Sequence, residues 1–83
     1  MRKEQIRWAC RRGMLELDIL LEAFFDKHFD TLTSEQQQIF ETLLVQQDPD
    51  LYSWFIGLAQ PTNEKLKDMV HLIKSTKLNE HFT

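Results

Sequence analysis

The chain has 83 residues and a mass of 10.0 kDa, which leaves room for one small domain and argues against a large enzyme with a deep cleft. Hydrophobic residues make up 42% and charged residues make up 28%, with a net charge of −3, an ordinary globular composition that argues against a disordered tail. Two glycines and two prolines are too few for the turns of an all-β fold. We therefore predict an all-α protein, a compact five-helix bundle in a single domain spanning residues 1–83.

Two helices are predicted on either side of Gly13. The first runs from about Arg2 to Arg12 and ends at Gly13, because glycine readily adopts the left-handed conformation that ends a helix. The second runs from about Met14 to His28 and has acidic residues on its back face. Residues at helical spacing predict the buried faces. They are Ile6, Ala9, Cys10 and Gly13 in the first helix, and Met14, Leu17, Leu20, Leu21, Phe24 and Phe25 in the second.

Start signals predict the third and fourth helices. Thr33 and Gln36 have the spacing of a capping box, in which each side chain bonds the backbone amide of the other. Asp48 and Pro49 predict an N-cap followed by the first helical residue, and Gly57 marks the end of that fourth helix. The residues expected to face the core are Ile39, Phe40, Leu43 and Leu44, followed by Leu51, Trp54, Phe55 and Leu58.

The last helix is predicted to open at residues 60–62, a Gln-Pro-Thr sequence. Residues after about Thr76 have no clear pattern and are expected to fray. Its expected core face consists of Leu66, Met69, Val70 and Ile73.

Charge is unevenly distributed along these helices. The first twelve residues carry five basic side chains against Glu4, whereas residues 13–60 carry nine acidic side chains against Lys27. A basic helix on an acidic body favours an acidic partner surface or phosphate groups, and an ordinary solvated face is the alternative. Trp8 leaves the buried face of the first helix and lies near Arg11 and Arg12. It either covers the edge of the core or belongs to a contact surface, since Trp and Arg dominate interface hot spots.

No catalytic or metal-binding constellation is present in the sequence. The three histidines lie on separate segments without ligand spacing, and no Gly-rich phosphate loop occurs. Cys10 has arginines nearby that would lower a thiol pKa, but its place on the buried face favours a small core residue. From the residues alone we predict a binding module with no catalytic residues and no bound metal.

The cysteine content and the lack of long apolar segments indicate the cellular compartment. A single cysteine, Cys10, excludes an internal disulfide and fits a reducing environment. The N-terminal residues lack an apolar signal region, and no apolar run approaches the roughly 18 residues of a membrane span. We expect a cytoplasmic protein without direct membrane insertion.

Residues 8–18, WACRRGMLELD, resemble the signature of the small FAD assembly factors of succinate dehydrogenase, the SdhE family. The hallmark of that family is an R-G-x-x-E motif, filled here by Arg12, Gly13 and Glu16. The resemblance continues through residues 25–32 and 40–44 and the DPDLYSW sequence at 48–54, and it covers at least residues 6–73. The motif alone is short, but the whole array is specific.

The resemblance implies a five-helix assembly factor, or chaperone, that is not itself an enzyme. Family members bind the flavoprotein subunit of succinate dehydrogenase, and in bacteria that of fumarate reductase, and they promote covalent attachment of FAD to a histidine of that client. FAD is thus the cofactor of the client, and no cofactor is expected to bind stably to this chain. Family members have also been labelled antitoxins, a weaker assignment.

The resemblance and the residue types together predict a partner-binding site at the junction of the first two helices. Two apolar side chains would anchor the client, and two arginines would pair with its carboxylates or carbonyls. The glutamate would accept hydrogen bonds from client amides or an arginine, and the glycine would let the backbones approach. The predicted site residues are Trp8, Arg11, Arg12, Gly13, Glu16 and Ile19.

The main alternative is a small helical nucleic-acid-binding or antitoxin-type regulator, suggested by the basic first helix. The sequence pI of about 5.5 and the acidic body argue against it, and no helix carries a set of base-reading side chains. We therefore expect no nucleic-acid partner. A small enzyme and a permanent structural subunit of the respiratory complex are further alternatives.

Overall fold

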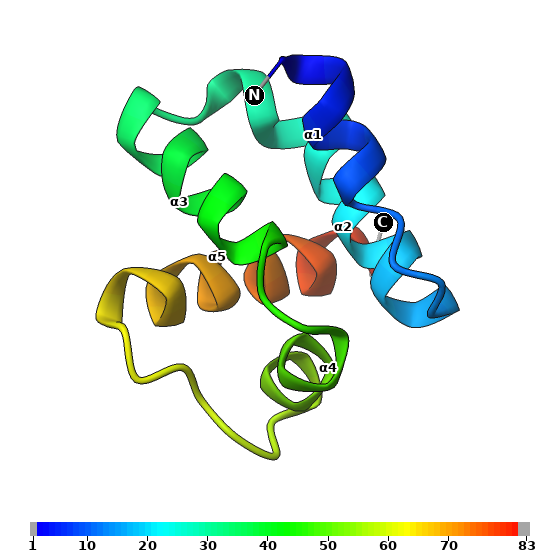
Figure 1. Cartoon of the computed structure of the whole chain (residues 1–83), viewed down its shortest axis with the longest axis vertical. Helices are drawn as coiled ribbons and strands as arrows, with labels where there is room; N and C mark the ends of the chain where they lie inside the picture. Colours follow the sequence, from blue (N-terminus) through cyan, green and yellow to red (C-terminus); the bar gives the residue numbers. More distant parts are fainter. Residues whose placement is uncertain (1, 82–83) are drawn as a thin grey trace.

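The computed structural model describes the backbone of residues 2–81 and the side chains through residue 76. The described backbone contains five α-helices and one short 3-10 helix, joined by loops. No strand occurs within these residues, so the predicted all-α, five-helix fold is confirmed. Figure 1 shows α5 crossing the molecule and α4 below it, seen end-on. The elements are α1 (Lys3–Ala9), α2 (Leu15–His28), η1 (Phe29–Thr31), α3 (Ser34–Leu44), α4 (Asp48–Ile56) and α5 (Glu64–His81).

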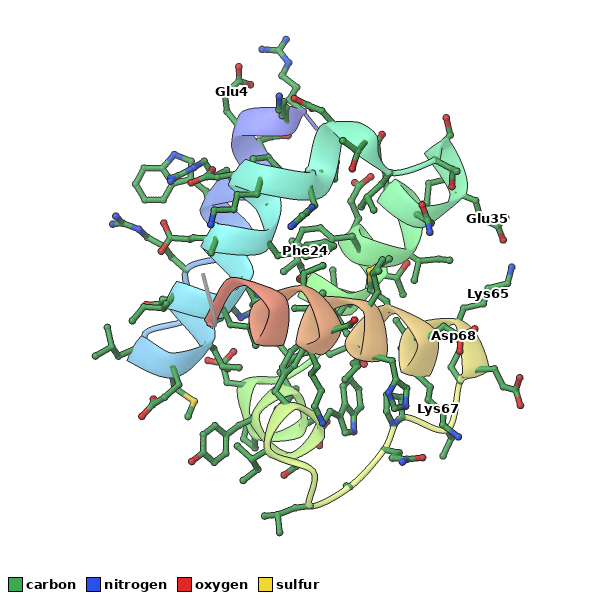
Figure 2. All side chains as sticks on the ribbon, turned by 180° about the vertical axis from the view of Figure 1, so that it is seen from behind. Glu4, Phe24, Glu35, Lys65, Lys67 and Asp68 are labelled. Carbon is green, nitrogen blue, oxygen red and sulfur yellow. The ribbon has the colours of Figure 1, made fainter. Side chains whose placement is uncertain are left out.

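The core lies where α5 packs against α2, α3 and α4. Phe24 points into this space, as Figure 2 shows, and its ring centroid lies 5.6 Å from that of Phe40. Phe25 and Phe29 stack at 4.7 Å beside them. The predicted stripes of α2, α3 and α5 supply most of this core, so the helical spacing identified it correctly. The residues less than 2% exposed are Cys10, Leu17, Leu21, Phe40, Leu43, Leu51 and Ile73.

The capping box of α3 forms as predicted. The backbone N–H of Gln36 donates to the Thr33 hydroxyl at 3.1 Å, and the Gln36 side chain accepts from the Thr33 N–H at 3.0 Å. The last helix begins later than predicted, at Glu64 rather than near residues 60–62. Asn63 caps it, because its Oδ1 accepts hydrogen bonds from two amides of the first turn, those of residues 65 and 66, at 2.8 and 3.1 Å.

Three further predictions at helix ends were wrong. The first helix ends at Ala9 rather than Arg12, and Gly13, which was predicted to face the core, is exposed in the following loop. Asp48 is the first residue of α4 and not its N-cap, which is Gln47. Leu58 was predicted to be buried but is 77% exposed, because the chain turns away at the left-handed Gly57.

Two predictions concern the end of the chain and membranes. Helix α5 continues to His81, and the predicted fraying after residue 76 falls on side chains outside the described residues. Within residues 2–81, no helix combines the length and the apolar character needed to cross a membrane.

Candidate functional site

The loop between α1 and α2 contains the R-G-x-x-E motif and is held by local hydrogen bonds. Gly13 has φ +84°, a left-handed conformation that strains any residue with a side chain. A Cβ atom at Gly13 would meet no atom within 4 Å, so the glycine serves the turn rather than close packing within this chain. The backbone N–H of Arg12 donates to Asp18 Oδ1 at 2.5 Å, which fixes the loop on the first turns of α2.

Arg12 points into the molecule, with only 16% of its side chain exposed. Its Nε donates to Asp48 Oδ1 at 2.7 Å. The terminal nitrogens donate to three backbone carbonyls, those of Ala9 at 2.9 Å, Leu44 at 2.6 Å and Gln46 at 2.8 Å. These carbonyls belong to the end of α1 and to the α3–α4 connection. The guanidinium therefore joins the motif loop to the distant segment that contains the DPDLYSW sequence.

Trp8 lies on the outside of α1 and is 72% exposed. The guanidinium carbon of Arg11 lies 5.6 Å from the centroid of its ring, within the range of a cation–π contact. Together with Glu4 and Arg7, these side chains line a shallow hollow of about 280 Å³. The structure thus excludes the alternative in which Trp8 covers the core, and it brings two of the predicted site residues together.

The other arginine of this helix, Arg7, is bound within the chain. Its Nε and terminal nitrogen donate to the two oxygens of Asp26 at 2.9 and 3.0 Å, and Glu22 lies 3.5 Å from it. The hydrogen bond from Arg7 lowers the pKa of Asp26 below its ordinary value. Arg11 lies 3.6 Å from Glu22. The basic charge of α1 is therefore largely opposed by the acidic back face of α2.

Glu16 and Ile19 lie on the first turns of α2, and both are exposed, Ile19 by 58%. No described side chain or backbone group forms a hydrogen bond or ion pair with the Glu16 carboxylate. Glu16 lies at the edge of a mainly apolar groove between α2, α4 and α5. Because helix α2 has its positive dipole end there, the carboxylate is favourably placed without needing an internal partner.

Cys10 is a core residue and not a reactive thiol. It is fully buried, and its Sγ donates weakly to the Ile6 carbonyl at 3.5 Å. Burial raises the pKa of the thiol to about 12, with the nearby Glu22 acting in the same direction. At neutral pH the group is protonated and cannot act as a nucleophile. His28 packs against Phe24, with 5.3 Å between ring centroids, in agreement with a packing role.

The described side chains contain no cluster of three or more ligating residues that would hold a metal ion. The hollow beside Trp8 does not fit a pyrophosphate group such as that of FAD. The cations that line it, Arg7 and Arg11, already face carboxylates. A pyrophosphate needs unopposed N–H donors or cations, which this hollow does not offer.

Sequence reasoning identified the exposed residues of this region but missed the partners that hold it in place. Asp18 and Asp48 are those partners, and neither was predicted to face the motif loop. Asp48 comes from 36 residues further along the chain, and its place in a helix-start pattern suggested a cap instead. Four of the predicted site residues have exposed side chains, and we refer to these four together as the exposed surface. They are Trp8, Arg11, Glu16 and Ile19.

Comparisons with known proteins agree with the resemblance. Residues 4–77 match the family model described as flavinator of succinate dehydrogenase. The FAD assembly factor SdhE of Idiomarina loihiensis is 47% identical over 73 residues, which cover 88% of this chain and 81% of that protein. The FAD assembly factor SdhE of Vibrio cholerae is 45% identical over 78 residues, which cover 94% and 91% of the two chains.

The fold is shared with a solved structure as well. The solution structure of a UPF0350 protein matches with a TM-score of 0.79 at 45% identity, covering 94% of this chain and 83% of that one. Sequence family, relatives and fold thus agree over nearly the whole chain. The protein belongs to the flavinator of succinate dehydrogenase family, whose curated members include the FAD assembly factors SdhE.

Proposed function

We propose that this protein is an FAD assembly factor that binds the flavoprotein subunit of succinate dehydrogenase and promotes covalent attachment of FAD to it. The family match over residues 4–77 is the observation that carries this role. The flavoprotein of fumarate reductase is a second client in this proposal, and FAD remains the client's cofactor. The protein acts in the cytoplasm and performs no catalytic chemistry of its own.

The exposed surface is the part of the molecule that contacts the client. Trp8 offers an aromatic ring that is 72% exposed and is stiffened by the guanidinium of Arg11. Glu16 offers a carboxylate that no described group of the chain uses, with the apolar Ile19 one turn away. Aromatic and arginine anchors at the centre of an interface commonly supply most of its binding free energy.

Arg12 and Gly13 act on the same interface indirectly. The four hydrogen bonds of the Arg12 guanidinium leave it few donors for a client, so it fixes the shape of the loop and not a contact. Gly13 keeps the turn in its left-handed conformation and leaves open space where a client backbone can approach. The proposal thus gives Arg12 a positioning role in place of the predicted pairing with client carboxylates or carbonyls.

In this proposal the protein promotes flavin attachment by positioning groups of the client, and not by taking part in the bond-forming chemistry. FAD, bound in the client, supplies the chemistry of the covalent bond. The described side chains offer no activated nucleophile, since Cys10 is buried and protonated at neutral pH. Binding would instead hold the client in the conformation that aligns its histidine with the flavin, which converts a rare arrangement into a populated one.

Reconstitution tests this function directly. Apo flavoprotein subunit, FAD and this protein are mixed, the sample is denatured, and flavin fluorescence is read on the client band. We expect fluorescence with wild type and none with Gly13→Arg, whereas the control variant Gly57→Arg retains it. Gly57 has φ +85° and equally open surroundings, so the two variants carry the same backbone strain. Equal fluorescence with and without wild-type protein would contradict the proposed function.

A further inference from the structure

The mainly apolar groove that begins at Glu16 is a second feature of the molecule that the fold itself does not use. Its floor consists of Leu17 and Leu20 of α2, and its far wall consists of Tyr52, Phe55 and Ile56 of α4, enclosing about 320 Å³. The two leucines are buried, the two aromatic residues are partly buried, and Ile56 is 49% exposed. A volume of this size accommodates one or two large side chains with their apolar surface removed from water.

Opposite charges stand at the edge of this groove. Glu16 lies at the N-terminal end of α2, and Lys74 reaches the groove from α5. Neither side chain makes a hydrogen bond or ion pair with any other described residue. The edge therefore presents one carboxylate and one ammonium group that are both available to an incoming segment.

We infer that this groove receives a segment of the client flavoprotein in which an apolar side chain is flanked by a basic residue and an acidic residue. The apolar side chain packs between Leu20 and Phe55, the basic residue pairs with Glu16, and the acidic residue pairs with Lys74. This inference rests on the proposed function, because the client is the partner named there. It extends the interface from the α1–α2 junction to α4 and α5.

Two observations favour the client as the occupant of the groove. The groove is continuous with the exposed surface, since Glu16 belongs to both and Ile19 lies one turn away on α2. Its edge also carries one carboxylate and one ammonium group that no described residue pairs with, so it offers complementary charges to a segment that carries both signs. A partner of mixed charge suits the edge, whereas an anionic ligand would meet Glu16.

In this inference, α4 contributes part of the client-binding surface. Arg12 binds Asp48 at the first residue of α4 and the Leu44 and Gln46 carbonyls just before it. The motif loop and the helix that carries Tyr52, Phe55 and Ile56 are therefore tied together. One arginine sets the spacing between the two halves of the interface.

The test measures the affinity of the apo flavoprotein subunit for variants of this protein by isothermal titration calorimetry. Ile56→Asp places a charge on the groove wall, and we expect at least about a tenfold loss of affinity. Leu58→Asp is the matched control, because Leu58 is 77% exposed two residues further on and does not line the groove. Lys74→Glu should weaken binding about fivefold through the edge charge. Circular dichroism and urea unfolding check that each variant folds.

The outcomes separate this inference from the proposed function. Loss of affinity with Ile56→Asp and Lys74→Glu, but not with Leu58→Asp, supports the groove. If Trp8→Ala weakens binding while both groove variants bind as wild type does, the groove inference fails and the proposed function stands. No binding by wild-type protein overturns both. A wild-type dimer that Ile56→Asp converts to monomer in sedimentation, with client affinity unchanged, assigns the groove to a second copy and overturns the inference.

Discussion

Arg12 and Glu16 belong to the same five-residue motif, yet their side chains have opposite environments. Arg12 is 16% exposed and makes four hydrogen bonds within the chain, to Asp48 and to three backbone carbonyls. Glu16 is exposed and has no partner among the described residues. The comparison indicates that a short motif combines two tasks. One half maintains the shape of the surface, and the other half is available to a client.

The energetic consequences of the two halves differ accordingly. Removing a largely buried charged group leaves its partners without their hydrogen bonds, and that cost appears as lost stability. Removing an exposed side chain leaves stability almost unchanged, and any cost appears only when a client binds. Stability and affinity measured on the same variants therefore distinguish the two roles.

Arg12→Ala should have the largest effect on folding. It leaves Asp48 and the carbonyls of Ala9, Leu44 and Gln46 without their donor, and we expect a loss of about 3 kcal/mol in the free energy of unfolding. Urea unfolding followed by circular dichroism measures it. Arg12→Lys should recover less than half of the loss, because one ammonium group cannot reach all four acceptors. Unchanged stability in Arg12→Ala would contradict the structural role of this arginine and would indicate that it contacts the client instead.

Trp8→Ala should show the reverse pattern. The ring is 72% exposed, so we expect the free energy of unfolding to change by no more than about 0.5 kcal/mol. Affinity for the client should fall by about 2 kcal/mol, a factor of about 30, as for an aromatic hot spot. Calorimetry measures the affinity. Val45→Ala serves as the control, since Val45 is 67% exposed just after α3 and lines neither the Trp8 hollow nor the groove, and it should bind as wild type does.

Gly13→Arg and Gly57→Arg sharpen the comparison at matched backbone strain. Both glycines have φ near +85° and open space around the missing Cβ, so each variant should lose about 1–2 kcal/mol in the free energy of unfolding. Only the first should lose client binding. Equal loss of affinity in the two variants, measured where both are folded, would show that strain alone explains the effect.

The smallest expected effect concerns pH. The hydrogen bonds from Arg7 lower the pKa of Asp26 in the folded protein, so the pair stabilises the fold above the ordinary pKa of that carboxyl group. The stabilisation is lost as pH falls through the lowered pKa. Because both side chains are about half exposed, the change in stability is small. Thermal unfolding of Asp26→Asn and wild type should converge at low pH; a constant difference between them would contradict this assignment.

Local signals predicted much of the fold. The spacing of Thr33 and Gln36 gave the start of α3, and the apolar periodicity gave most of the core, because both depend on neighbours within one or two turns. The end of α1 depends on distant groups. The backbone of Arg12 bonds Asp18 and its side chain bonds Asp48, which draws the loop out of the helix after Ala9.

The candidate site was predictable only in its outline. The position of Trp8 on the outer side of α1 followed from helical geometry, and its exposure agrees. The inward direction of Arg12 did not follow, because its acceptors lie on a segment more than thirty residues away. The groove between α2, α4 and α5 could not be predicted from the sequence either, because it forms only when the three helices pack together.

The most direct test of the central claim is the affinity of the client flavoprotein for Glu16→Ala. We expect affinity to fall by about 1–3 kcal/mol while the free energy of unfolding stays at the wild-type value. Glu64→Ala is the matched control, since Glu64 is also an exposed carboxylate in the first turn of a helix, and it should bind as wild type does. Wild-type affinity in Glu16→Ala would contradict the claim that the exposed half of the motif binds the client.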